Sequence, residues 1–245
     1  QRIFDIKRRL KMVVSQRAQY RKRRKANHVF QIAIVGYTNA GKSTLFNQIT
    51  NSETLEEDQL FATLDPLTRQ IQFPTGFRSL ITDTVGFLQD LPTSLIASFR
   101  STLEEVTEAD FILHVVDAAD PDMEQQHDTV IALLKDLGAH SIPMLTVYNK
   151  KDLLTSEFFP PHHPSVLVSV LEAEDVQAIM TKVEEILREE WQWYSIALDP
   201  NEGRLLHRLE HETILDEQVF DEEQMKYLLT GYIQEDHPLT SYMKE

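Results

Sequence analysis

A glycine-rich loop stands between an apolar segment and a helix-like segment near the start of this chain. Residues 36–43 read G-Y-T-N-A-G-K-S, which fits the pattern G-x-x-x-x-G-K-[ST]. The apolar run at 30–35 is typical of a buried strand, and residues 43–49 predict the first turns of a helix. Backbone N–H groups of such a loop, together with the positive end of the helix dipole, bind phosphates. The pattern therefore predicts a nucleotide-binding α/β domain.

Individual loop residues have predicted roles. The Lys42 ammonium would reach the β- and γ-phosphates, and the Ser43 hydroxyl would bind Mg²⁺. The residues expected around the nucleotide are Gly36, Tyr37, Thr38, Asn39, Ala40, Gly41, Lys42, Ser43 and Thr44.

A second motif indicates which base is bound. Asn149, Lys150, Lys151 and Asp152 follow an apolar strand at 142–148 and fit N-K-x-D, the pattern of guanine-specific GTPases. The Asp152 carboxylate can accept hydrogen bonds from guanine N1–H and the 2-amino group, whereas adenine offers neither donor there. Lys150 can lie along the base, and Asn149 can tie this loop to the phosphate loop. We therefore predict GTP and GDP as the ligands.

A third motif follows the strand at 77–82. Asp83, Thr84, Val85 and Gly86 fit D-x-x-G. Asp83 would hold Mg²⁺ through water, and the Gly86 N–H would sense the γ-phosphate, since only glycine lets the backbone come so close.

Between these motifs lies the segment F-A-T-L-D, made of Phe61, Ala62, Thr63, Leu64 and Asp65. The Thr63 hydroxyl is the candidate that completes the Mg²⁺ shell when GTP is bound. Thr68 is the rival, although it begins a strand-like run at 68–73.

The last nucleotide motif is expected at Ser169, Val170 and Leu171, after an apolar strand. GTPases usually carry S-A-K or S-A-x here, so the sequence departs from the pattern. Backbone contacts to guanine O6 would tolerate that change.

In their order, these motifs resemble the HflX GTPases. G-Y-T-N-A-G-K-S, F-A-T-L-D-P, D-T-V-G-F and N-K-K-D follow one another, and F-A-T-L-D-P and D-T-V-G-F-L-Q-D-L-P are specific to that family. The resemblance spans residues 1 to about 195, and the tail more loosely. It implies binding to the large ribosomal subunit and its RNA, splitting or rescue of stalled or stress-idled ribosomes, and for some members antibiotic resistance. The family region that reaches the subunit's catalytic centre would precede residue 1.

Two features bear on hydrolysis. Small GTPases often have glutamine directly after D-x-x-G, but this chain has Phe87, which cannot orient water. We therefore expect a low intrinsic rate that the ribosome stimulates, with Lys42, Thr63 and Gly86 as catalytic residues. Asn39 resembles the asparagine that helps hold K⁺ in cation-stimulated GTPases; a turn-stabilising asparagine is an equal alternative.

Two alternative functions stay open. One is a ribosome-assembly or RNA-modification GTPase of the same superfamily. The other is a GTP-gated ribosome-binding scaffold with negligible turnover, for which Phe87 is the main argument.

Positive charge is concentrated at the start of the chain. Residues 1–25 hold eleven Lys or Arg against one acid, while the whole chain carries −15, so residues 26–245 carry −25. This split suggests a basic arm for nucleic acid on an acidic body, although a solvated charged helix is the alternative. The candidate RNA contacts are Arg17, Arg21, Lys22, Arg23, Arg24 and Lys25.

Strands that alternate with helices predict the fold class. We expect an α/β P-loop GTPase domain at 29–195, with a mostly parallel sheet, one antiparallel hairpin and helices on both faces. A basic helical linker at 1–28 would precede it, as the end of an N-terminal domain that is largely absent. A small α+β domain at 196–245 would follow.

Composition excludes several classes. The chain has no cysteine, so it has no disulfide or thiolate metal site. No run approaches the roughly 18 apolar residues of a membrane span. We expect a cytoplasmic, monomeric protein without DNA or membrane partners. The H-x-x-E-H pattern at 207–211 occurs without peptidase context, which favours a solvated helix.

Overall fold

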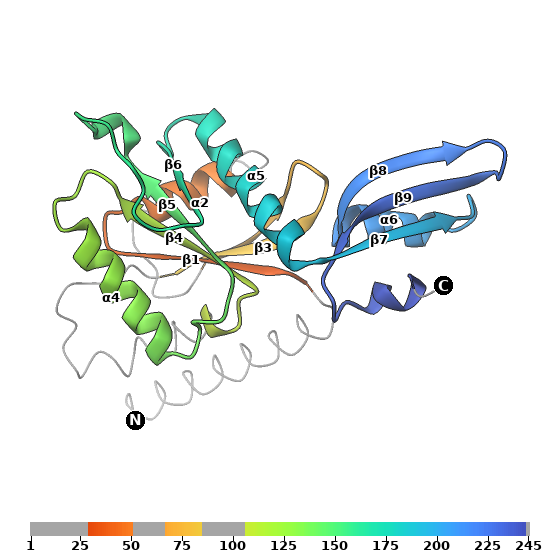
Figure 1. Ribbon diagram of the computed structural model, residues 1–245, viewed down its shortest axis with the longest axis horizontal. Coiled ribbons are helices and arrows are strands. Elements are labelled where there is room, and N and C mark those ends of the chain that lie inside the picture. Colours follow the sequence, from red (N-terminus) through yellow and green to blue (C-terminus); the bar gives the residue numbers. More distant parts are fainter. Residues whose placement is uncertain (1–28, 51–66, 85–105, 244–245) are drawn as a thin grey trace, which may run out of the picture.

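The structure is a computed structural model that describes residues 29–50, 67–84 and 106–243. Its main part is a six-stranded sheet in the order β2-β3-β1-β4-β5-β6 (Figure 1). The strands are β1 (Gln31–Gly36), β2 (Leu67–Gln72), β3 (Arg78–Asp83), β4 (Phe111–Asp117), β5 (Met144–Asn149) and β6 (Ser165–Leu167). All neighbouring pairs are parallel except β2 with β3.

The strand sequences explain these positions. β1 and β4 are almost entirely buried, as expected of central parallel strands with both faces covered. β2 lies at the edge and is mostly polar and exposed, with Ile71 buried. A turn at 73–77 joins β2 to β3, and Gly76 adopts φ +97° there. This antiparallel hairpin and the otherwise parallel sheet confirm the predicted fold class.

Helices cover both faces of the sheet. Helices α2 (Lys42–Thr50) and α5 (Ala173–Glu190) pack on one face, where Leu45 and Ile179 are completely buried. Helix α4 (Met123–Asp136) packs on the other face through Val130 and Leu134 (Figure 1). The two cores hold β1 rigidly between them, which fixes the loop that leaves its carboxyl end.

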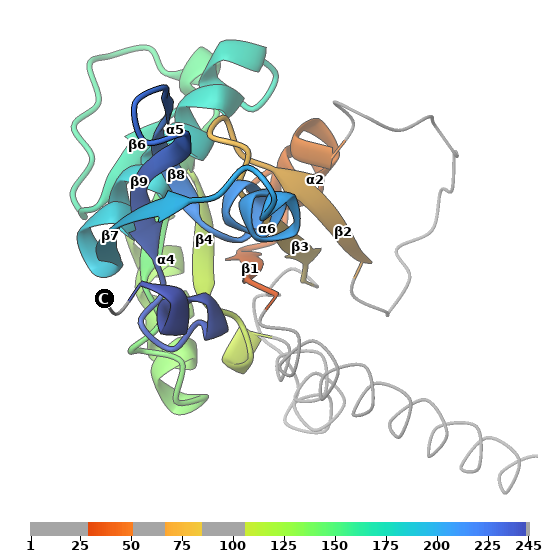
Figure 2. The same ribbon diagram turned by 90° about the vertical axis from the view of Figure 1, so that its right-hand side faces the viewer.

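A second, three-stranded antiparallel sheet follows α5 directly, in the order β7-β9-β8 (Figure 2). Its elements are β7 (Gln192–Leu198), α6 (Gly203–Glu212), β8 (Ile214–Asp221) and β9 (Lys226–Ile233), with a short 3-10 helix η2 (Pro238–Tyr242) after them. One face packs on α6 around Leu209 and Leu229, both with no exposed surface. This part of the chain is thus a small unit of one helix on an antiparallel sheet, and its first strand begins at Gln192.

Side chains join the two sheets. Trp191 meets Phe30 and Phe77 edge to face, with ring centroids 5.4 and 5.3 Å apart. Arg188 of α5 forms an ion pair with Asp216 of β8 at 2.5 Å. The junction therefore combines an aromatic cluster with a charged pair.

Several predicted segments lie outside the described residues. They are the basic linker expected at 1–28, the first switch loop expected at about 51–67 except its last residue, the second switch expected from 84 to about 91 except its first residue, and most of the helix expected at about 93–107. Among the helices that the structure describes, none has the length and apolar character to cross a membrane.

Candidate nucleotide-binding site

The glycine loop has the backbone geometry that phosphate binding requires. Gly36 has φ +148° and Gly41 has φ +100°, a region that side chains disfavour. A Cβ at Gly36 would lie 2.2 Å from the Val115 carbonyl oxygen, and one at Gly41 would lie 2.2 Å from Asn149 Nδ2. Asn39 has φ +63° and lies in the left-handed region that asparagine tolerates. The two glycines are therefore required by the packing of the loop.

The side chain of Lys42 lies inside this loop. Its Nζ donates to the Tyr37 carbonyl oxygen at 2.6 Å, and Lys42 is only 6% exposed. Burial lowers the pKa of Lys42 to about 8, while nearby Asp83 acts in the opposite direction. An anion in the loop would favour the charged form and raise this pKa.

Ser43 and Asp83 face each other across the start of α2. The Ser43 hydroxyl donates to Asp83 Oδ2 at 2.9 Å. Burial raises the pKa of Asp83, although the Ser43 bond and Lys42 lower it. Asp83 Oδ1 is buried and has no hydrogen-bond partner among the described residues.

This pair of side chains fits Mg²⁺. The ion prefers oxygen ligands at about 2.0–2.1 Å in octahedral geometry, which places neighbouring ligands about 3 Å apart. A hydroxyl and a carboxylate 2.9 Å apart, with a second carboxylate oxygen lacking a partner, suit a cation or its bound water.

Asn149 joins the phosphate loop to the last motif. Its Nδ2 donates to the Ala40 carbonyl oxygen at 2.8 Å, and its Oδ1 accepts from the Val170 N–H at 3.0 Å. Asn149 is 2% exposed. A single amide thus fixes two loops that are remote in sequence.

Lys150, Lys151 and Asp152 separate after Asn149. Lys150 has φ +66°, and its Nζ contacts Asp117 Oδ2 at 2.5 Å. Lys151 pairs with Asp175 of α5 at 2.6 Å and points away from the cleft lining. Asp152, in a short 3-10 helix η1 (Lys151–Leu153), lines the cleft.

A carboxylate of α5 holds the loop at 169–171 in place. Asp175 Oδ2 accepts from the Ser169 N–H at 2.7 Å, and this bond and Lys151 lower the Asp175 pKa against the opposing effect of burial. Ser169 and Val170 are buried, whereas the Leu171 side chain is 69% exposed. The loop therefore presents backbone and one apolar side chain to the cleft.

These elements enclose a cleft of about 650 Å³ at the carboxyl ends of the parallel strands. It is lined by Asn39, Gly41, Lys42, Ser43, Thr44, Asn149, Lys150, Asp152, Leu153, Ser169, Val170 and Leu171. Phosphate-loop residues and base-motif residues thus share one cavity large enough for a nucleotide.

Comparisons with known proteins agree with this geometry. A family profile described as "50S ribosome-binding GTPase" matches residues 31–150. GTPase HflX of Alkalihalophilus pseudofirmus is 50% identical over 245 residues, which is 100% of this chain and 58% of that protein. GTPase HflX of Escherichia coli is 38% identical over 230 residues, covering 91% of this chain and 54% of that protein. The chain belongs to the HflX family of GTPases.

This HflX-family chain spans a little over half the length of those two relatives. Among solved structures, a GTP-binding protein from Sulfolobus solfataricus in complex with GDP matches with a TM-score of 0.53 at 20% identity, covering 71% of this chain and 60% of that one. A complex of SsGBP and GDP matches with a TM-score of 0.54 at 22% identity, covering 74% and 58%. These likenesses show the shared fold.

Some predicted site residues of the HflX-family chain do not line the cleft. They are Gly36, Tyr37, Thr38, Ala40, Asp83, Thr84 and Lys151. The Tyr37 and Ala40 carbonyls hold Lys42 and Asn149, and the Thr84 hydroxyl donates to the Ile34 carbonyl oxygen at 2.5 Å. Tyr37, Ala40 and Thr84 therefore support the residues of the cleft by hydrogen bonds without lining it themselves.

Other predicted residues of this HflX-family site lie outside the described residues. They are Phe61, Ala62, Thr63, Leu64, Asp65, Val85, Gly86, Phe87, Arg17, Arg21, Lys22, Arg23, Arg24 and Lys25.

Sequence reasoning missed three residues at the HflX-family site. Asp117 ends β4 and forms an ion pair with Lys150. Asp175 accepts a hydrogen bond from the Ser169 N–H and pairs with Lys151. Leu153 lines the cleft as a second exposed apolar side chain, in addition to Leu171. Asp117 had a usable signal, because it directly follows a buried strand whose neighbour in the sheet carries N-K-x-D. Asp175 had none, since its partner depends on how α5 docks.

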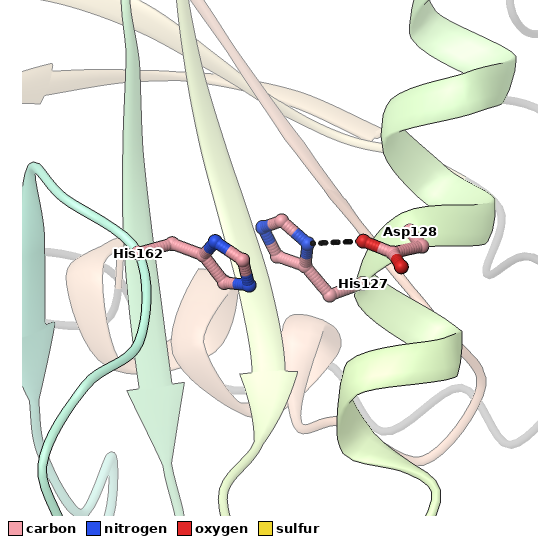
Figure 3. A group of neighbouring side chains, drawn as sticks. All are labelled: His127, Asp128 and His162. Carbon is pink, nitrogen blue, oxygen red and sulfur yellow. Dashed lines mark hydrogen bonds and ion pairs between the residues drawn. The ribbon is translucent and has the colours of Figure 1, made fainter.

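A column of imidazoles lies in the HflX-family chain between β4 and α4. His162 stacks on His127 with ring centroids 3.8 Å apart and an interplanar angle of 2° (Figure 3). The ring centroids of His127 and His114 lie 5.0 Å apart. His114 is 1% exposed, and its Nδ1 has no hydrogen-bond partner among the described residues. Burial, followed by the neighbouring His127, His162 and Lys42, lowers the pKa of His114 to about 3.

Proposed function

We propose that this chain binds GTP and GDP with Mg²⁺ in the cleft and hydrolyses GTP, as the switch of a protein that acts on the large ribosomal subunit. The observation that carries the nucleotide assignment is the bridge by Asn149. It places Asp152 and the loop at 169–171 in a cavity shared with Lys42 and Ser43.

Guanine selectivity would come from Asp152. Its carboxylate lines the cleft and has no hydrogen bond or ion pair within the described part of the chain, so both oxygens are available to donors on the base. Leu153 and Leu171 line the same cleft and offer apolar surface to a base. Adenine would leave the Asp152 oxygens without hydrogen-bond donors in a partly desolvated site. ATP would therefore bind more weakly than GTP.

At the phosphate end, Lys42 would exchange the Tyr37 carbonyl for phosphate oxygens. Ser43 and Asp83 would hold Mg²⁺, which neutralises charge on the β- and γ-phosphates. Thr63 and Gly86 remain the proposed contacts that sense the γ-phosphate, and release of these contacts would switch the protein off.

Hydrolysis is proposed to be slow without a partner, because Phe87 cannot position water. The ribosome is the proposed stimulating partner. Support comes from the family description "50S ribosome-binding GTPase" and from the basic segment at 17–25. Splitting or rescue of stalled ribosomes is proposed for the full-length protein rather than for this chain alone.

A multiple-turnover GTPase assay tests this function. Inorganic phosphate would be measured with and without purified large subunits, in KCl and in NaCl. We expect the large subunit to raise the rate by at least about tenfold, a threshold well below the roughly 10³–10⁵-fold that a supplied arginine finger gives. A rise of only a few-fold would contradict ribosome triggering, and no turnover under any condition would favour the scaffold alternative. Equal rates in the two salts would remove the K⁺ role of Asn39.

The assembly alternative needs a binding experiment. Co-sedimentation of the GTP-bound chain with mature large subunits and with their precursors would be compared. We expect binding to mature subunits, and a preference for precursors would support an assembly GTPase.

A further inference from the structure

Three side chains on one face of α6 offer metal ligands outside the nucleotide cleft. His207, Glu210 and His211 are spaced i, i+3 and i+4, so they occupy neighbouring positions on the helix surface. One ligand atom from each lies within 4.8 Å of the others. We propose that this face binds a divalent transition-metal ion such as Zn²⁺, through two imidazoles and one carboxylate.

The hydrogen bonding of His211 prepares one ligand. Its Nδ1 lies 3.2 Å from the Gly76 carbonyl oxygen. A carbonyl can only accept, so Nδ1 carries the proton and Nε2 keeps its lone pair for a metal. A backbone carbonyl that fixes the tautomer in this way is the usual support of metal-binding histidines.

Close packing between α6 and the β2–β3 turn supplies that carbonyl. Gly76 adopts φ +97°, and a Cβ there would lie 3.2 Å from the Glu210 carbonyl oxygen. The three candidate ligands therefore lie where α6 contacts the β2–β3 turn at the edge of the main sheet. An ion bound to His211 would stabilise the contact between α6 and this turn.

The other two candidate ligands, His207 and Glu210, form no polar contact with another described side chain. Arg208 forms two hydrogen bonds with Glu212, at 2.9 and 2.6 Å, which keeps it from Glu210. Within the described ranges, neither the Glu210 carboxylate nor the His207 imidazole has a hydrogen bond or an ion pair. His207 meets His211 edge to face, with centroids 4.4 Å apart and planes at 88°.

The dimensions suit a tetrahedral ion. Zn²⁺ binds nitrogen and oxygen at about 2.0–2.2 Å, which places its ligand atoms about 3.4 Å apart. The ligand atoms already lie within 4.8 Å of one another, so they would have to approach by at most about 1.4 Å to reach that spacing. Three protein ligands leave one position for water. Imidazole ligands favour Zn²⁺ over Mg²⁺, so this site would differ in selectivity from the site at Ser43 and Asp83.

A second group of candidate ligands has less suitable geometry. His127 and His162 stack with their planes 2° apart, so their in-plane lone pairs run parallel and do not converge on a common ion (Figure 3). His127 Nδ1 also faces Asp128 Oδ1 at 3.5 Å. This group makes a useful internal control.

Calorimetric titration of the nucleotide-free chain with ZnCl₂, in excess MgCl₂, tests the proposal. We expect one saturable site that is weakened about tenfold or more by His207→Ala and by Glu210→Gln, the size seen even for changes outside the ligand shell. His162→Gln should leave the affinity unchanged. His207 and Glu210 are preferred to His211, whose removal would also break the Gly76 contact.

Cobalt provides a spectroscopic check. Co²⁺ bound to the chain should show visible absorption bands of a four-coordinate ion, and His207→Ala should abolish them. Thermal unfolding in EDTA would confirm that each variant is folded. The proposal would be overturned by zinc binding weaker than about 0.1 mM, or by binding lost in His162→Gln but kept in His207→Ala. Because no nucleotide is present, these outcomes are independent of the proposed GTPase function.

Discussion

The side-chain amide of Asn149 donates to the backbone carbonyl of Ala40 at 2.8 Å, across 109 positions of the sequence. The same amide accepts from the loop that follows β6. One buried side chain therefore joins the loop proposed to bind phosphate to the loop proposed to contact the base, so a change in either loop should affect the other.

Removing this amide should damage both stability and binding. Asn149→Ala leaves the Ala40 carbonyl and the Val170 N–H buried without partners, each costing about 1–3 kcal/mol. We expect the free energy of unfolding to fall by about 2–4 kcal/mol, together with weaker GDP binding. Urea unfolding and fluorescent-GDP titration would measure the two effects. Asn201→Ala, in an exposed turn, is the control and should change neither.

Asp83→Asn should separate metal binding from stability. The isosteric amide loses the charge that attracts Mg²⁺, so the Mg²⁺ concentration needed for GTP binding should rise about tenfold or more. Burial already disfavours the charged carboxylate, so unfolding in EDTA should cost no more than about 1 kcal/mol. Asp136→Asn, on the exposed end of α4, serves as the control. An unchanged Mg²⁺ requirement would contradict the assigned site.

Base selectivity should change with Asp152→Asn. The amide can no longer accept from both guanine N1–H and the 2-amino group, but its NH₂ can donate to the oxygen that xanthine carries at that position. We expect GDP affinity to fall and xanthosine diphosphate affinity to rise, each by about tenfold or more. Competition binding would measure the ratio, with Asp236→Asn as an exposed control. A variant that keeps its guanine preference would disprove the role of Asp152.

Acid should destabilise the fold through His114. Its pKa in the folded chain is about 3, below the ordinary value of 6.5, so the unfolded chain takes up a proton first. The stabilisation is present above pH 6.5 and is lost as the pH falls towards 3, by up to about 1.4 kcal/mol per pH unit. In His114→Leu this contribution should vanish, so urea unfolding at pH 6.5 and 4.5 should show a smaller loss than in the parent. His140→Gln, an exposed histidine, should retain the parent's pH dependence.

Much of the fold followed from local patterns. Continuous apolar runs predicted β1 and β4 because both faces of a central parallel strand are buried. The antiparallel hairpin was predicted as well, and Gly76 adopts φ +97° at its turn. Local patterns do not reveal how closely β7 follows α5: α5 ends at Glu190 and β7 begins at Gln192, with almost no loop between them.

The sequence by itself determined which chemical groups this protein carries and in what order: the loop of Gly36 to Ser43, then Asp83, then Asn149 and Asp152. Such motifs depend on neighbouring residues, because a strand, a turn and a helix end are all local structures. Only the tertiary structure decided that Asn149 holds Ala40, that Asp175 supports Ser169, and that His211 meets Gly76. Each of these contacts depends on strand order and helix docking, which arise from the packing of the whole core and not from any one segment.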